Sequence, residues 1–97
     1  MATFRAILLF PGDAGEGRYE FEAPSEFIEN APARIVDSFL NTIQGLTVPG
    51  EIIDAEINAA HNYRDIRTVT ASGSLILKGG GAVPFLVMIS ENRDAVL

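Results

Sequence analysis

The chain has no cysteine and only one histidine. Without cysteine it can form neither a disulfide nor a thiolate metal site, which fits a reducing compartment. A single histidine excludes a histidine-pair metal site, and the Gly-x-Ser-x-Gly elbow of many Ser/His/Asp hydrolases is absent. We therefore expect no metal site and no cofactor, and we favour a protein that is not an enzyme.

Basic residues are also scarce. The chain has seven Lys and Arg but thirteen Asp and Glu, which gives a net charge of −6. Nucleic acids and anionic membranes attract clustered positive charge, so the composition argues against both as partners. No apolar run reaches the roughly 18 residues of a membrane span. The apolar run 6–10 is too short for a signal-peptide core. We expect a cytoplasmic protein.

Residues 30–45 form the strongest helix pattern in the chain. Asn30 is suited to cap the helix N-terminus, Pro32 fits its first turn, and Gly45 fits its end. A second, short helical turn capped by Ser25 is expected just before it. The spacing of the apolar residues of 30–45 places them on one face. They are Ile35, Val36, Phe39, Leu40 and Ile43.

Strand patterns flank this helix on both sides. Alternating side chains predict strands over 3–10 and 18–23, and β-branched residues predict a long strand over 66–78. The segment 83–90, which is apolar on both faces, is the last predicted strand, and it follows a hairpin turn at the glycines 79–81. Gly73 suggests a bulge or bend, and the polar tail 91–97 has little to fix it. With 97 residues, we expect a single α+β domain over 1–97. Its antiparallel sheet of about five strands, in the chain order ββαβββ, would carry one helix across one face.

Residues 51–60 are open to two interpretations. As a strand, this segment places Ile53, Ala55, Ile57 and Ala59 on one face. As a helix, it would align Ile53, Ile57 and Ala60, and its alanines and glutamates favour helix. Unbroken alternation and the strand that follows favour the strand interpretation.

The first and last strands carry apolar residues on both faces, which is unusual in an antiparallel sheet covered by one helix. Phe85, Val87 and Ile89 can face the helix, but a second set then needs another cover. That set is Ile7, Leu9, Leu86 and Met88. We expect these four residues to form an interface with a second copy of the chain, in a homodimer packed sheet to sheet.

Three polar clusters are candidate sites. In residues 61–65, which we predict to be a turn, His61, Tyr63, Arg64 and Asp65 could bind an anion or move a proton. Asp54 and Glu56 share one strand face and could act as paired carboxylates. The loop 11–17 has three glycines but matches no phosphate or calcium motif. For each cluster, ordinary solvation and turn geometry are the favoured explanation.

Three functions compete. The first is a non-enzymatic, homo-oligomeric binding or accessory module that uses an apolar sheet face. The second is a small ligand-binding protein or acid–base enzyme that uses the turn at 61–65 and the same sheet face as a pocket. The third is a subunit whose apolar face is covered by a different protein partner. We favour the first.

Overall fold

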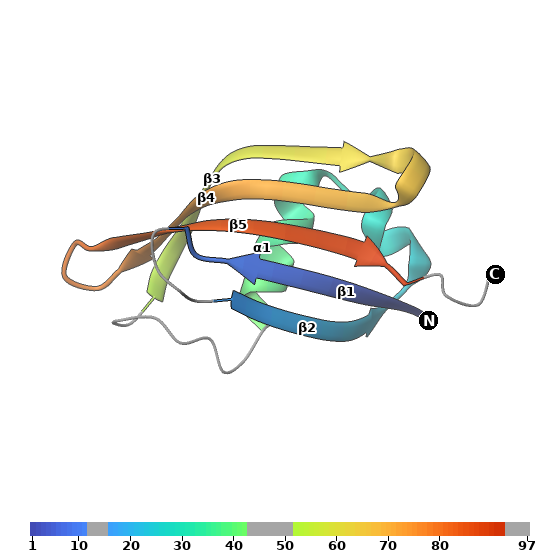
Figure 1. Cartoon of the computed structure of the whole chain (residues 1–97), viewed down its shortest axis with the longest axis horizontal. Coiled ribbons are helices and arrows are strands. Elements are labelled where there is room, and N and C mark those ends of the chain that lie inside the picture. Colours follow the sequence, from blue (N-terminus) through green and yellow to red (C-terminus); the bar gives the residue numbers. More distant parts are fainter. Residues whose placement is uncertain (12–15, 43–51, 93–97) are drawn as a thin grey trace.

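A computed structural model describes residues 1–11, 16–42 and 52–92. In these residues, five antiparallel strands form one sheet in the order β2-β1-β5-β4-β3, and the helix α1 lies across one face (Figure 1). This arrangement confirms the predicted α+β fold. The strands are β1 (Ala2–Leu9), β2 (Glu16–Ala23), β3 (Ile52–Tyr63), β4 (Thr68–Leu77) and β5 (Ala82–Glu91). The helices are α1 (Pro32–Thr42) and the 3-10 helices η1 (Ser25–Glu29) and η2 (Arg64–Ile66).

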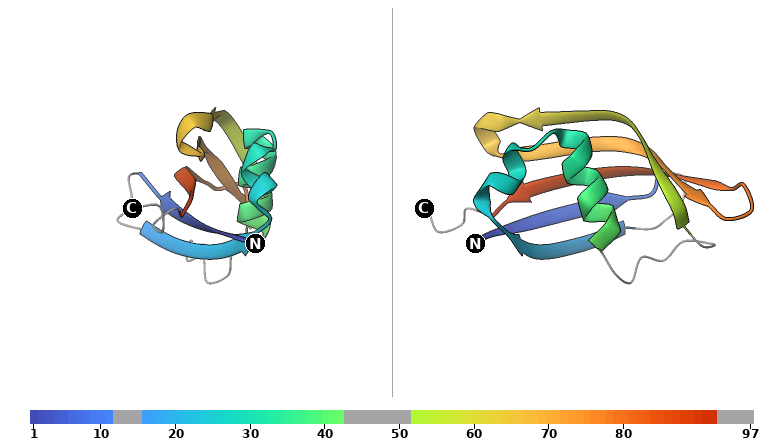
Figure 2. Two further views of the ribbon diagram at one scale, coloured as in Figure 1. Left: turned by 90° about the vertical axis from the view of Figure 1, so that its right-hand side faces the viewer. Right: turned by 180° about the vertical axis from the view of Figure 1, so that it is seen from behind.

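The apolar stripe of α1 packs against the inner face of the sheet. The sheet curves around the helix (Figure 2). Ile35, Val36 and Phe39 are buried and Leu40 is half-buried, as the periodicity predicts. Phe39 also contacts the Tyr19 ring, with the ring centroids 5.6 Å apart. The predicted helix residues beyond 42, including Ile43 and Gly45, lie outside the described residues.

The predicted role of Asn30 as the N-cap of α1 is wrong. Its side-chain Nδ2 donates to the Phe27 carbonyl at 2.9 Å, and its backbone N–H bonds to the same oxygen. Asn30 therefore closes the end of η1, while the Ala31 carbonyl accepts the first α1 bond, from the Ile35 N–H at 3.1 Å. Ser25 does not cap η1 either, because it is the first helical residue and no side-chain bond caps this helix.

On β5, Pro84 lies two residues beyond the last residue that pairs with β1, where a missing N–H is tolerated.

The inward residues of β1, β4 and β5 form the core and follow the predicted alternation. The buried strand residues are Phe4, Ala6, Leu8, Val69, Ala71, Leu75, Leu77, Phe85, Val87 and Ile89.

Segment 51–60 is strand, as predicted, but its faces differ from the prediction. Register shifts at Ile52/Asp54 and Ile57/Ala59 mark two bulges, each of which reverses the alternation. Ile53 is consequently 61% exposed and Ala59 is exposed, while Ala60 is half-buried against the core. The bulge expected near Gly73 is thus in the opposite strand. A Cβ on Gly73 would collide with the Glu56 carbonyl oxygen.

The hairpin at 79–81 is confirmed. Gly79 and Gly80 both have φ +98°, a conformation that glycine adopts without strain. Among the described residues, no helix is both long and apolar enough to cross a membrane.

Candidate binding surface on the outer sheet face

The strand register arranges side chains in rows across the outer face, which is the sheet face opposite α1. In one row, Ile7 of β1 lies between Arg18 of β2 and Met88 of β5. The row continues through Thr70 of β4 to His61 of β3. Apolar residues thus occupy the centre of this row, and polar or charged residues occupy its two ends.

The centre of the outer face holds the outer apolar patch, formed by Ile7, Leu9, Leu86 and Met88. Ile7 is directly opposite Met88 and Leu9 is directly opposite Leu86, so the four side chains are contiguous. Ile7 and Leu9 are half-buried, whereas Leu86 is 44% and Met88 41% exposed. All four line an apolar hollow of about 250 Å³. The structure therefore brings the four predicted interface residues together.

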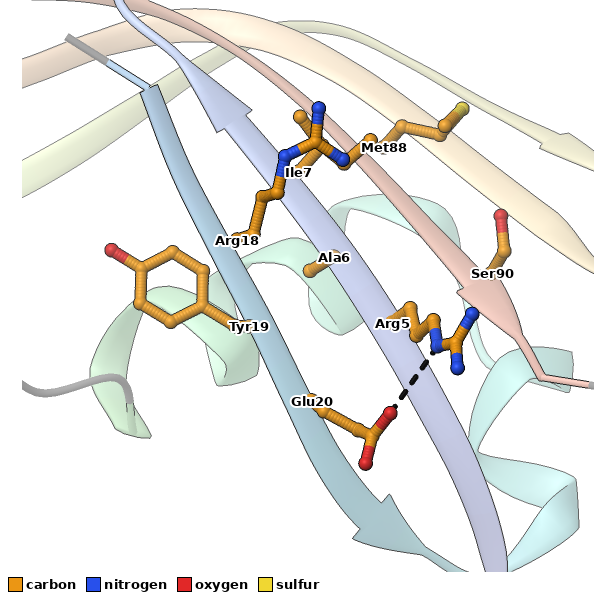
Figure 3. A pocket seen from close by; sticks show the side chains of 8 residues that line it. All are labelled: Arg5, Ala6, Ile7, Arg18, Tyr19, Glu20, Met88 and Ser90. Atoms are coloured by element: carbon orange, nitrogen blue, oxygen red, sulfur yellow. Dashed lines mark hydrogen bonds and ion pairs between the residues drawn. The ribbon is translucent and has the colours of Figure 1, made fainter.

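A larger hollow, of about 550 Å³, lies where the patch meets β2. Figure 3 shows Arg5, Arg18 and Glu20 around it, with Ile7 and Met88 on its apolar side. Arg5 Nε and Glu20 Oε2 form an ion pair at 3.2 Å, but both side chains are about 60% exposed. Such an exposed pair contributes little to stability. It gives the patch a charged border on the β2 side.

The predicted turn at 61–65 is not a turn throughout, because β3 extends to Tyr63. His61 and Tyr63 are consequently on the outer face, directly opposite Thr70 and Thr68 of β4. Their ring centroids are 6.3 Å apart, and both side chains are exposed. They border the same face as the apolar patch, with β4 between them and β5.

Arg64 and Asp65 belong to η2 and are both exposed. Arg64 lines a separate pocket beside η1, together with Asn62, whose Nδ2 donates to the Ile28 carbonyl at 3.0 Å. The four predicted residues therefore do not surround one cavity. His61 and Tyr63 are on the outer face, whereas Arg64 faces the pocket beside η1.

The other polar candidates gain no support as sites. Asp54 and Glu56 are exposed, and Asp54 Oδ1 accepts a bond from the Ala55 N–H at 2.8 Å. Within 1–11, 16–42 and 52–92, no group of three His, Cys, Asp or Glu side chains could hold a metal ion. Of the loop 11–17, residues 12–15 lie outside the described residues, and Glu16 and Gly17 already belong to β2.

The sequence interpretation missed one partly buried ion pair. Glu91 was expected in a loose tail, but it ends β5, and its carboxylate receives two bonds from the Arg67 guanidinium, each 3.1 Å long. The next residue is also held, because the Asn92 N–H bonds to the Thr3 carbonyl at 2.7 Å. No local pattern marks this pair, because its partners are 24 residues apart and meet only through the β4–β5 register.

Comparisons with known proteins found no matching family model, no matching curated protein and no matching solved structure. Functional inference for this chain therefore starts from its own surfaces.

Proposed function

We propose that this protein is a small, non-enzymatic binding module that self-associates through the outer face of its sheet. The observation that supports the proposal is the outer apolar patch, which places four large apolar side chains at the centre of a face that α1 does not cover. A monomer gains nothing from leaving Leu86 and Met88 exposed to water, whereas burial against a second sheet removes that apolar area.

The form of the face fits a two-fold homodimer. In such a dimer the same patch serves both partners, and two sheets pack about 10 Å apart. An apolar centre with Arg5, Arg18 and Glu20 at one border and His61 at the other resembles the core and rim of an interface. The patch also lies on strands, so little backbone ordering is needed on association.

The size of the face predicts a weak dimer. β1 and β5 pair over six residues, which is about 20 Å along the strands. Five strands span about 19 Å across the sheet, giving a projected area of about 400 Å². Stable complexes bury about 800 Å² per partner. We therefore expect a dissociation constant of about 10 μM or weaker.

Sedimentation velocity across a concentration series tests this proposal. The sedimentation coefficient should rise from the monomer value toward the dimer value over the micromolar range. Met88→Lys should keep the protein monomeric, because a charge would be buried at the centre of the interface. Ile53→Lys is the matched control, since Ile53 is an exposed apolar residue on the helix side and should not affect association.

A second function shares this surface. A small ligand could occupy the same apolar face, with His61 as its titratable partner in binding or acid–base chemistry. The register supports this alternative, because His61 is in the same row as Met88. Under this alternative, His61→Ala removes a ligand-binding or turnover signal without lowering the melting temperature. An unchanged signal would eliminate it.

A further inference from the structure

The segments η1 and η2 lie at the same end of the molecule (Figure 1). A pocket of about 290 Å³ is lined by residues of both segments and of β3, on the helix side of the sheet. This pocket, the Arg64 pocket, is independent of the outer face. Its wall is fixed by the bond from Asn62 Nδ2 to the Ile28 carbonyl. It is lined by Ile28, Glu29, Asn62, Arg64 and Arg67.

Arg67 is held in one orientation at this pocket. Its backbone has φ 47°, and among the described residues it is the only one other than glycine with a positive φ. Such a conformation costs free energy unless surrounding contacts compensate. Those contacts are present. Nε and Nη2 bind the two Glu91 carboxylate oxygens at 3.1 Å, and Nη2 also donates to the Ser25 carbonyl at 2.6 Å.

These contacts use only part of the guanidinium. The remaining nitrogen, Nη1, has Glu29 Oε2 at 3.8 Å, which is too long for a hydrogen bond. The Glu29 side chain is 65% exposed, so it is a loose partner that water can replace. The Arg67 side chain is itself 21% exposed. Arg67 thus presents a fixed, incompletely satisfied cation to the pocket.

Arg64 supplies a second cation from η2. Its side chain is exposed, and the part of the chain that the structure describes contains no ion pair or hydrogen bond from its guanidinium. Two guanidinium groups line one small pocket, and only one of them is neutralised by a short carboxylate contact. Guanidinium groups bind oxyanions through charge-assisted, often paired hydrogen bonds.

We propose that the Arg64 pocket binds the carboxylate of a small ligand or peptide, between Arg64 and Arg67 Nη1. Arg64 and Arg67 carry two positive charges and Glu29 and Glu91 carry two negative ones, so the four residues are neutral together. When the exposed Glu29 side chain turns away into water, one positive charge is left in excess, and a singly charged carboxylate matches it. A phosphate dianion would exceed it, in a protein whose net charge is already −6. The volume is at the small end of ligand sites, which suits a short carboxylate.

The probes are acetate and inorganic phosphate, titrated into ¹⁵N-labelled protein at constant ionic strength. We expect saturable acetate shifts at the Arg64 and Arg67 side-chain N–H groups and at Asn62, with weaker binding of phosphate. A short peptide and its C-terminally amidated form then distinguish a peptide C-terminus from a free small carboxylate. Shifts that remain linear in acetate would contradict the proposal, and tighter phosphate binding would overturn its carboxylate assignment.

Two exposed substitutions test the geometry without touching the Arg67–Glu91 pair. Arg64→Gln should weaken acetate binding by about five-fold or more, because one of two cations is lost. Glu29→Gln should strengthen it by about three-fold, because a competing carboxylate is removed. Arg34→Gln makes the same charge change on α1 and should leave the affinity unchanged. Equal weakening by Arg64→Gln and Arg34→Gln would show that acetate responds to general charge alone and would refute the pocket.

Discussion

β5 carries large apolar side chains on both of its faces, yet the two faces differ sharply in exposure. Phe85, Val87 and Ile89 are at most 2% exposed beneath α1, whereas Leu86 and Met88 between them are more than 40% exposed. The same strand and the same types of residue thus serve two surfaces. The inner face belongs to the core of the monomer. The outer face carries equally large apolar side chains, but none of the described residues covers them.

The comparison is tested most strongly by two neighbouring truncations on β5. Phe85→Ala should lower the free energy of unfolding by about 3–5 kcal/mol, because it leaves a cavity in a packed core. Leu86→Ala should change it by only about 0.5 kcal/mol in the monomer, because Leu86 is 44% exposed. Urea denaturation at low protein concentration measures both. Similar losses in the two variants would mean that the outer face is already buried within the monomer.

The next effect concerns the close contact between β4 and β3 at Gly73. Gly73→Ala should lower the unfolding free energy by about 2 kcal/mol, because its Cβ would meet the Glu56 carbonyl oxygen at the β3 bulge. Gly81→Ala is the control. A Cβ there meets only the Leu77 side chain, at 3.5 Å, which is an ordinary contact. Thermal unfolding should separate the two variants clearly, and equal melting temperatures would show that the strands yield at Gly73.

The last comparison, whose larger effect only equals that of Gly73→Ala, concerns ion pairs on the two sides of the sheet. Arg67→Met should cost about 2 kcal/mol, because it removes two charge-assisted bonds to the Glu91 carboxylate, which is only 9% exposed, and the bond to the Ser25 carbonyl. Arg5→Met should cost at most about 0.5 kcal/mol, because the Arg5–Glu20 pair is in water. Chemical denaturation of both variants checks this order. If Glu91→Gln in the Arg67→Met background recovered none of the lost stability, the explanation through the charge of the Glu91 carboxylate would be wrong.

Periodicity predicted much of this fold. The inward sets of β1, β4 and β5 and the stripe of α1 follow from apolar residues at strand and helix spacing, because one side of each element must be buried. The contiguity of Ile7, Leu9, Leu86 and Met88 also follows, provided that β1 and β5 are neighbours. The sequence did not contain that neighbour relation in any local pattern.

The errors arose where non-local contacts override local pattern. The two bulges of β3 reverse its alternation, so Ile53 and Ala59 face water and His61 joins the outer face. Asn30 satisfies the end of η1 instead of the start of α1, although its residue type suits both roles. The Arg67–Glu91 pair depends on the β4–β5 register, and no residue near either partner in the sequence predicts the pair.

Native mass spectrometry of the purified protein at tens of micromolar tests the central claim most directly. Self-association through the outer face predicts a population of dimer whose mass is twice that of the chain, and Met88→Lys should abolish it. A monomer at every concentration, with no extra mass, would contradict the claim. A monomer that carries an additional small mass would contradict it as well, and would indicate instead that the outer face is a ligand site.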